Sequence, residues 1–368
     1  MPETILLLHS SAGRYGADRQ LLALAAGLDR DRFTPVAVLP ERGELAELLE
    51  AAGVETALAP LTVLRRAELG PRAAARLLRP NVGELESLAR ARGAALVHSN
   101  TSVIVSGHRL AAALGVPHVL HVRELYPRIP LAWPLWRRRL LGADRVLCVS
   151  HAVAAQFSGS ENVAVVHDGL AQVPPRAEPS TERDTFTVAV LGRISDWKGQ
   201  DVLARALAEP PLAAIGAVGL VAGAPWPGAH RPLAELERLR ETLALSDRLR
   251  ILGFADDLDR LLGAVDAVAV PSTRPDPFPN AALEAAAAGV PVVAAAHGGL
   301  PEMLRDGETG LLVEPGDPRA LAAALRSLAD DPARAEALGA AAANDVRARF
   351  SAERMLAAVQ AHYAALLD

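Results

Sequence analysis

Short, almost wholly apolar segments alternate with segments of helical period along nearly all of this 368-residue chain. Continuous apolar runs are typical of strands in parallel sheets, because helices cover both faces of such sheets. The first half has six such runs, at residues 5–10, 35–40, 94–100, 117–122, 145–150 and 163–169. The second half has six more, at 185–193, 217–223, 247–254, 264–270, 291–296 and 310–315. The pattern predicts an α/β fold built from doubly wound parallel sheets.

A Pro-rich, polar stretch interrupts this alternation once (AQVPPRAEPSTERDT, 171–185). We predict a linker at 173–184 that separates a Rossmann-like N-terminal domain (1–172) from a Rossmann-like C-terminal domain (185–350), with a final helix at 351–368. Two domains also suit the length, since single cores stop growing at about 250–300 residues. From Asp317 onward the pattern is helical, with a predicted break near residues 344–350.

The composition favours a cytoplasmic protein that binds no nucleic acid. The formal net charge is −5, and the chain has no nucleic-acid motif. Its one cysteine, Cys148, lies in an apolar strand pattern, so disulfides are not expected and a reducing cytosol suits the chain. The segment MPETILLLHSS has no basic leader and is predicted as a strand instead of a signal peptide. No uncharged apolar run is long enough to span a bilayer.

Two basic segments are candidates for contact with an anionic partner. Residues 61–80 carry five arginines and one glutamate, and residues 126–139 combine Trp133 and Trp136 with three consecutive arginines. Basic residues beside tryptophan could rest on the inner face of a membrane or hold an anionic acceptor. The alternative is a pair of surface helices with solvated arginines. We therefore expect a cytoplasmic protein with a candidate peripheral membrane surface.

One stretch of the second half, PSTRPDPFPNAALEAAAAGVPVVAAAHGGLPEM, carries two features that indicate a ligand site. Glu284 lies on a predicted helix whose other side chains are almost all alanine, and Asp276 lies eight residues earlier in a Pro-rich loop. Ionised carboxylates accept hydrogen bonds, so both could hold sugar hydroxyls. The pair Gly298 and Gly299 precedes a second helix, where an anion could approach backbone N–H groups. The alternative is a solvent-facing glutamate and an ordinary glycine turn.

A pair of cations follows the first predicted strand of the C-terminal domain. Arg193 and Lys198 lie five residues apart across a strand–turn–helix junction, so both side chains can point into one site. Of the 38 basic residues, Lys198 is the one lysine, and a compact ammonium group suits a phosphate. Two cations could clamp a diphosphate and stabilise it as a leaving group. The alternative for Lys198 is that one lysine remains by chance. Trp197, beside it, could pack against these cations, and the alternative is an ordinary packing role.

The first predicted strand ends in HSSAGRYGADRQ, where Gly13 and Gly16 form a turn before a helix that opens near residue 17. Ligands of Rossmann-like sheets bind at this end of the strands. The turn lacks the full G-x-G-x-x-G pattern, so we infer no NAD.

These motifs together resemble glycosyltransferase family 4. The resemblance rests on LGRISDWKGQDVLARAL, GFADDLDRLLGAVDAVAVPS, PDPFPNAALEAAAAGVPVVAAAHGGLPEML and DGETGLLVEPGDPRALAAAL, which cover about residues 185–330. GRYGADRQLL and PHVLHVRE extend it more loosely into the first half. It implies a retaining, sugar-nucleotide-dependent enzyme of GT-B architecture, with two Rossmann-like domains facing across a cleft. The N-terminal domain would be the acceptor side and the C-terminal domain the sugar-nucleotide donor side, and the final helix would cross back to the first domain.

The resemblance also implies roles for individual residues. Arg193 and Lys198 would bind the donor diphosphate, Glu284 the ribose hydroxyls and Asp276 the donor sugar. The remaining residues implied in donor binding are Gly13, Gly16, Phe254, Phe278, Pro279, Asn280, Gly298, Gly299 and Leu300. The resemblance implies no metal and no cofactor, and the sugar nucleotide is a co-substrate.

Three positions depart from the family pattern. Asp276 stands where the family has glutamate, and Pro279 where many members have glycine. Arg123 and Glu124 stand where many relatives have a His-Asp pair, and His121 is expected to face the same side of its strand as Arg123. By this resemblance Arg123, Glu124 and His121 join Arg193, Lys198, Asp276 and Glu284 as candidate catalytic residues.

The expected reaction is a same-face displacement in which the leaving phosphate takes the acceptor proton. Arg193, Lys198 and the helix start at 298–299 would stabilise its charge without a metal. The triplets DRD (29–31) and DLD (257–259) are expected to be a surface turn and a helix start. The acceptor could be lipid-linked, a polysaccharide or a small natural product. Alternatives are a GT-B sugar-nucleotide epimerase or hydrolase, a non-catalytic sugar-nucleotide-binding protein and a two-domain solute-binding protein.

Overall fold

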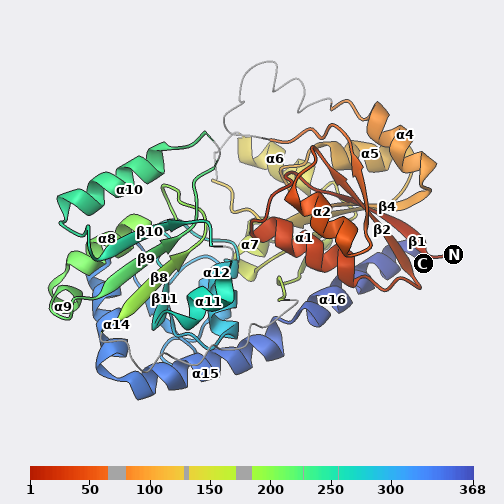
Figure 1. The fold of residues 1–368 in the computed structure, drawn as a ribbon. Helices are drawn as coiled ribbons and strands as arrows, with labels where there is room; N and C mark the ends of the chain where they lie inside the picture. The colour runs from red at the N-terminus through yellow and green to blue at the C-terminus, as the bar shows by residue number, and fades with distance from the viewer. Residues whose placement is uncertain (65–79, 128–131, 171–184, 227, 256) are drawn as a thin grey trace. The chain divides into compact units, whose positions relative to one another are not determined.

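The computed structural model describes residues 1–64, 80–127, 132–170, 185–226, 228–255 and 257–368. The chain divides into two compact units (Figure 1). Unit 1 comprises Met1–Ala171 and Ser351–Asp368, and unit 2 comprises Gln172–Phe350. The predicted linker at 173–184 lies outside the described residues.

The described part of unit 1 is built on a seven-stranded parallel sheet with the order β3-β2-β1-β4-β5-β6-β7. Its strands are β1 (Glu3–Leu8), β2 (Phe33–Leu39), β3 (Glu55–Leu58), β4 (Ala94–Ser99), β5 (His118–Val122), β6 (Arg145–Cys148) and β7 (Val163–Val165). The chain adds strands first on one side of β1 and then on the other, which makes the sheet doubly wound.

Helices cover both faces of this sheet because successive strand residues point to opposite faces. Ile5 and Leu7 of β1 belong to one apolar cluster with α1 (Gly16–Gly27), α2 (Glu44–Ala51) and α16 (Ala352–Leu367). Leu6 and Leu8 belong to a second cluster with α4 (Gly83–Ala91) and α5 (Ser106–Leu114). The shorter elements of this unit are α6 (Ala132–Leu140), α7 (His151–Ala154) and η2 (Ala155–Phe157).

Helix α16 is part of the core of unit 1, although it comes last in the chain (Figure 1). Met355, Val359 and Tyr363 are buried in the same cluster as α1 and β1. The Tyr363 hydroxyl is hydrogen-bonded to Nδ1 of His98, on β4. The helix enters unit 1 beside the end of the first segment, where the N–H of Ala352 donates to the carbonyl of Leu170 at 3.0 Å. Two segments far apart in sequence therefore make one core.

The described part of unit 2 has a six-stranded parallel sheet with the order β10-β9-β8-β11-β12-β13. Its strands are β8 (Thr187–Leu191), β9 (Val218–Ala222), β10 (Leu249–Gly253), β11 (Ala267–Val270), β12 (Val292–Ala295) and β13 (Leu311–Val313). Its helices are α8 (Gln200–Ala208), α9 (Pro210–Ala213), α10 (Arg231–Thr242), α11 (Leu258–Gly263), α12 (Asn280–Ala287), α13 (Leu300–Met303), α14 (Pro318–Asp330) and α15 (Pro332–Arg349).

The strand order reverses between β1 and β4 in unit 1, and between β8 and β11 in unit 2. Ligands of open α/β sheets bind beyond the carboxyl ends of the strands at such reversal points. The loops that follow these four strands are therefore the places to look for a site. None of the helices that the structure describes combines the length and the apolar character needed to cross a bilayer.

All twelve predicted strands are present, and the predicted fold class is confirmed. Strand β3 was missed. The helical break was predicted to begin near residue 344, which is too early, because α15 continues to Arg349. Asn344 lies inside this helix, and its side chain accepts a hydrogen bond from Arg347 at 3.3 Å. The break falls at Phe350 and Ser351, where the Ser351 hydroxyl caps α16.

Candidate functional site

The loops after β8 and β11 bring a cation and a carboxylate together in unit 2. Lys198 Nζ lies 2.7 Å from Asp276 Oδ2. The Asp276 side chain is 5% exposed and that of Lys198 is 24% exposed, so the ammonium group keeps one side open to solvent. It also lies 4.6 Å from the ring centroid of Trp197. Lys198 and Asp276, which the sequence analysis described as parts of two separate features, are in direct contact.

Arg193 follows the same strand and is held by an aromatic ring that the sequence analysis missed. Its guanidinium carbon lies 3.8 Å from the ring centroid of Trp226, which follows the neighbouring strand β9. Such cation–π contact stabilises one orientation of the guanidinium plane. The Arg193 carbonyl accepts a hydrogen bond from Gln200 at 3.0 Å, which fixes the backbone of the loop to the start of α8.

Glu284 is a buried carboxylate on the short helix α12. It is 6% exposed, and the alternative of a solvent-facing glutamate is therefore wrong. The helix begins at Asn280, with Pro279 as its N-cap, and Phe278 packs edge-on against Phe350 with ring centroids 5.3 Å apart. This contact ties the loop that carries Asp276 to the end of α15.

Gly298 and Gly299 are required by close packing beneath the Asp276 loop. A Cβ atom on Gly298 would lie 2.3 Å from the carbonyl oxygen of Asp276, and one on Gly299 would lie 2.1 Å from that of Pro277. The N–H of Gly299 already donates to the Asp276 carbonyl at 2.8 Å. The helix that follows, α13, has only four residues, so the expected helix-end field is small.

Two further predicted donor residues, Leu300 and Phe254, differ in exposure. Leu300 is completely buried, so it can offer a ligand only its backbone. Phe254 follows β10 and is 40% exposed, so its ring is accessible.

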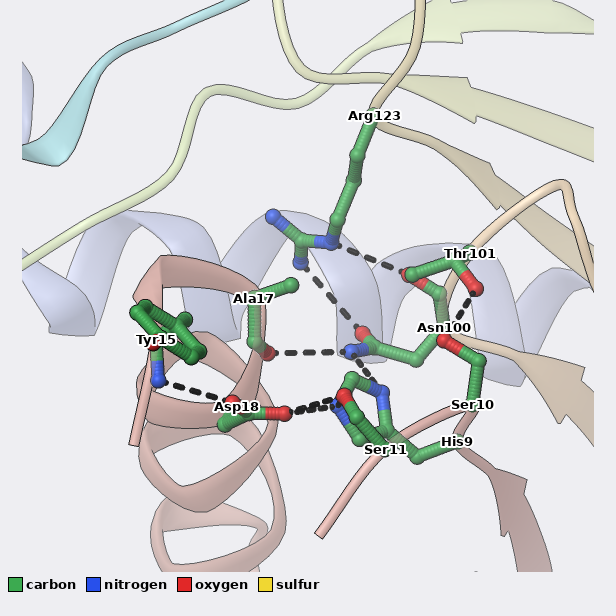
Figure 2. Close-up of polar contacts among 9 residues, drawn as sticks. All are labelled: His9, Ser10, Ser11, Tyr15, Ala17, Asp18, Asn100, Thr101 and Arg123. Atoms are coloured by element: carbon green, nitrogen blue, oxygen red, sulfur yellow. Dashed lines mark hydrogen bonds and ion pairs between the residues drawn. The ribbon is translucent and has the colours of Figure 1, made fainter. Parts of the chain in front are cut away.

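Unit 1 holds a buried polar cluster at the reversal point between β1 and β4 (Figure 2). His9 Nε2 lies 2.7 Å from Asp18 Oδ1, and both side chains are at most 2% exposed. The same carboxylate accepts from the Ser11 hydroxyl at 2.6 Å and from the Tyr15 N–H at 2.7 Å. Burial opposes its ionisation, but these hydrogen bonds and the attraction of His9 hold the pKa of Asp18 below its ordinary value. Asp18 thus fixes the turn that contains Gly13, directly before Gly16 begins α1.

Asn100, at the end of β4, joins His9 to Arg123 (Figure 2). Its amide nitrogen donates to Nδ1 of His9 at 3.0 Å and to the carbonyl of Ala17 at 3.3 Å. Its amide oxygen accepts from Nη2 of Arg123 at 3.3 Å. Since Nδ1 of His9 accepts, its other nitrogen carries the proton that Asp18 binds. Both nitrogens of His9 are therefore used inside the protein.

Arg123, which follows β5, is paired with a carboxylate that the sequence analysis did not single out. Its Nη1 lies 2.5 Å and 2.6 Å from the two carboxylate oxygens of Asp168, and the side chains are 8% and 6% exposed. Burial raises the pKa of Asp168 although the charge of Arg123 opposes this. Nε of Arg123 donates to the Asn100 carbonyl at 3.0 Å.

The other two candidates beside Arg123 have different surroundings. Glu124 accepts through Oε2 from the hydroxyl of Ser102 and from the N–H of Arg123, and Ser102 also contacts the Tyr126 hydroxyl at 2.7 Å. Burial raises the pKa of Glu124. His121 lies inside the sheet on β5, stacked on His98 with ring centroids 5.6 Å apart, and Arg123, just beyond the end of β5, is near enough for its charge to act on the His121 ring. Burial holds its pKa well below the ordinary value.

The described part of the basic segment 126–139 turns two of its three arginines inward. Arg137 donates to the carbonyls of Gln156 and Ser158, and Arg139 donates to the carbonyl of Val105. Leu135 is 74% exposed. Residues 65–79 of the other basic segment, and 128–131 of this one, lie outside the described residues.

The acidic triplets occupy the places predicted for them. Asp29 accepts a hydrogen bond from the N–H of Asp31 at 3.1 Å in a turn, and Asp257 caps α11 by accepting from the N–H of Arg260 at 2.8 Å.

Sequence profiles of two known families match this chain. The profile described as "Glycosyl transferases group 1" matches residues 175–345, and "Glycosyltransferase Family 4" matches residues 15–170. D-inositol 3-phosphate glycosyltransferase of Streptomyces avermitilis is 32% identical over 73% of this chain and 66% of its own length. The protein of the same name from Actinosynnema mirum is 35% identical over 69% of this chain and 68% of its own length. The chain thus spans about two thirds of these curated relatives.

A solved structure matches nearly the whole chain. HepE of Anabaena in complex with UDP-glucose has a TM-score of 0.84 at 26% identity, covering 99% of this chain and all of its own.

Proposed function

This chain belongs to the glycosyltransferases of family 4, and from that premise we propose that it moves a sugar from a nucleotide-diphosphate sugar to an acceptor hydroxyl. Its two Rossmann-like sheets have the GT-B architecture. We further propose that the anomeric configuration of the sugar is retained and that no metal takes part.

The observation that carries the proposal is the group of charged side chains at the reversal point of unit 2. Arg193 and Lys198 follow β8, while Asp276 and Glu284 follow the neighbouring strand β11. Two cations suit a diphosphate, and two buried carboxylates suit the hydroxyls of a ribose and a sugar. Because an ammonium group has three donors, Lys198 can keep Asp276 and still donate to phosphate oxygens.

The nucleotide we propose is UDP. The support is the likeness to HepE of Anabaena, which was solved with UDP and with UDP-glucose. The curated relatives are named for D-inositol 3-phosphate, so their names point to a hydroxylated acceptor for those proteins.

In the proposed reaction the acceptor oxygen attacks the anomeric carbon on the face from which the nucleotide leaves. The bond from that carbon to the β-phosphate oxygen breaks, and the acceptor proton passes to the leaving phosphate. Arg193 and Lys198 would stabilise the charge that develops on this phosphate. Asp276 would orient Lys198 and contact the donor sugar.

The first test is thermal stability of the wild type and Lys198→Ala in the presence of UDP, GDP, ADP or TDP without metal. A ligand at a hundredfold excess over its Kd adds about 2.7 kcal/mol to the stability of the native state. We expect UDP to raise the melting temperature of the wild type and to have little effect on Lys198→Ala. The control is Arg205→Ala, which removes an exposed cation from α8 and should respond like the wild type.

Product analysis then tests the reaction itself. Transfer to an acceptor with retained configuration, undiminished by EDTA, is expected. Turnover of the sugar nucleotide without an acceptor product would identify a hydrolase or epimerase instead. Nucleotide binding without turnover with any acceptor would identify a binding protein, and a response to none of the four nucleotides would remove the donor-site assignment.

A further inference from the structure

The carboxyl edge of the unit 1 sheet has two elements that would ordinarily attract an anion. One is the start of α1, a twelve-residue helix whose first N–H groups follow the turn at Gly13. The other is the guanidinium group of Arg123. In this chain each of them is occupied by a carboxylate of the protein itself.

The carboxylate of Asp18 lies at the N-terminus of α1. It accepts the N–H of Tyr15 and the hydroxyl of Ser11, and Asp18 is 1% exposed (Figure 2). A charge so close to the first turn cancels much of the attraction that the helix end would exert on a bound anion. His9 cannot replace this attraction, because its two ring nitrogens are bound to Asp18 and Asn100.

Asp168 forms an ion pair with Arg123. Both carboxylate oxygens of Asp168 accept from Nη1, so the two side chains form a buried ion pair. Nε donates to the carbonyl of Asn100 and Nη2 to its side chain. A guanidinium has five N–H donors on three nitrogens, and each of these nitrogens of Arg123 donates to a described residue. An N–H that remains for a ligand belongs to a neutralised group.

Hydroxyl groups and a third acid also lie at this edge. The Thr101 hydroxyl lies 3.3 Å from that of Ser10, and Ser102 and Tyr126 surround the carboxyl group of Glu124. Arg14, beside the glycine turn, is paired with Glu44 at 2.7 Å. Hydroxyl and carboxyl oxygens exchange hydrogen bonds with neutral hydroxyls, whereas a phosphate would bring about 1.5 to 2 negative charges to this edge.

We propose that the acceptor presents uncharged hydroxyl groups, and no phosphate, to the edge formed by Asp18, Arg123, Glu124 and Asp168. This rests on the proposed function, because it names the acceptor class of the proposed reaction. A remaining N–H of Arg123 donates to one acceptor hydroxyl, and Glu124 accepts from another. The chain would differ in this respect from relatives that are named for D-inositol 3-phosphate.

The first experiment is a competition between a neutral and a phosphorylated acceptor. Wild-type protein and UDP-glucose are incubated with equimolar myo-inositol and D-inositol 3-phosphate. A parallel incubation contains equimolar maltose and maltose 1-phosphate, and the amounts of the products are measured by mass spectrometry. We expect at least about tenfold more product from the neutral member of a pair, because like charges at this edge repel the phosphate. A phosphorylated product in excess would overturn the proposal.

The second experiment needs no turnover. Hydrogen exchange is followed with and without inorganic phosphate in the wild type, in Asp168→Asn and in the control Asp31→Asn, which alters an exposed aspartate of the same unit. Phosphate should leave residues 100–124 unprotected in the wild type and in the control. In Asp168→Asn it should protect residues 100–124, because Arg123 loses its neutralising partner.

The outcomes separate the two proposals. Protection of 100–124 by phosphate in the wild type would overturn the neutral-acceptor proposal even if Asp168→Asn fails to fold. Lack of protection of residues 193–198 by UDP would remove the proposed function, and the phosphate result in unit 1 would still stand by itself.

Discussion

Two histidines inside the unit 1 sheet are kept neutral by their surroundings. His98 and His118 lie on β4 and β5, and each is at most 3% exposed. Burial lowers the pKa of each to about 3, helped by Arg123 near His98 and by His108 near His118. The His98 ring is hydrogen-bonded to the Tyr363 hydroxyl, and the His118 ring to the Ser99 hydroxyl at 3.0 Å.

These histidines should make the protein less stable in acid. In the unfolded chain a histidine titrates near pH 6.5, so between that pH and about 3 the unfolded state binds protons that the folded state does not. The contribution of these neutral histidines to the free energy of unfolding is therefore fully present above pH 6.5. Below that pH the free energy of unfolding falls by up to about 1.4 kcal/mol per pH unit for each histidine. Urea unfolding followed by circular dichroism at pH 7, 6 and 5 measures this slope.

A matched pair of variants isolates the histidine contribution from that of the carboxylates. His98→Gln should lower stability at pH 7 and also reduce its loss between pH 7 and pH 5. His230→Gln, at an exposed position of unit 2, should leave the slope as in the wild type. Equal slopes in all three proteins would contradict the assignment of a neutral buried His98.

Residue chemistry made part of the candidate site predictable. Lys198 stood out as the single lysine, and Glu284 as the one acid on an alanine-rich helix. The cluster of His9, Asp18 and Asn100 was not predicted, because its members are brought together only by the sheet order. A usable signal was nevertheless present: short polar runs, HSS and SNTS, directly follow the two apolar segments at 5–8 and 94–98.

Among the elements, the turn at Gly298 and Gly299 controls the position of the loop that carries Asp276. Both glycines touch the backbone of that loop, at distances that leave no room for a side chain. The sequence analysis explained the same glycines by the approach of an anion. The structure gives them a second reason, close contact between two loops at the ends of β11 and β12.

Gly299→Ala should therefore weaken donor binding without altering any charged group. Gly299 has φ −82, a conformation that alanine adopts readily, so the effect would come from the added methyl group alone. Its Cβ would displace the Pro277 carbonyl and with it Asp276, and we expect at least about a tenfold higher Kd for UDP and a loss of about 1–3 kcal/mol of stability. Calorimetric titration and urea unfolding measure the two effects.

The control is Gly83→Ala, where the new Cβ would meet nothing closer than 3.6 Å. It should bind UDP as the wild type does. Unchanged affinity in Gly299→Ala would show that the loop has room to move.

Most elements could be predicted because buried parallel strands leave a strong pattern of apolar runs. β3 was missed because it has four residues, ETAL, of which two are exposed, at the edge of the sheet. An edge strand has a neighbour on one side only, so less of its sequence needs to be apolar. The break before α16 was placed too early because an asparagine inside α15 resembles a helix end, whereas its side chain is satisfied by Arg347.

At the scale of the whole molecule, each unit has a doubly wound sheet and an apolar core of its own. The core of unit 2 comes from one continuous segment, and that of unit 1 from two. The last segment contributes Met355, Val359 and Tyr363, each at most 3% exposed. Burial of a large apolar side chain stabilises by about 1.5–3 kcal/mol, and the total stability of a domain is about 5–15 kcal/mol.

Separate fragments should therefore behave differently. Residues 185–350 should unfold cooperatively in urea and still bind UDP. Residues 1–171 should show no cooperative transition until a peptide of residues 351–368 is added. A peptide with alanine in place of Met355, Val359 and Tyr363 is the control and should have no effect. A cooperative transition of 1–171 alone would contradict this division of the core.

The placement of α16 also sets an order of events during synthesis. A ribosome completes residues 1–171 first, yet the surface of α1 and β4 that α16 covers has no helix to cover it until the last residues emerge. Unit 2 is translated later, but all of its residues have been made before residues 351–368, which complete unit 1. Unit 1 is thus the first to be translated and the last to finish folding, and until α16 is made part of its apolar core stays exposed to water.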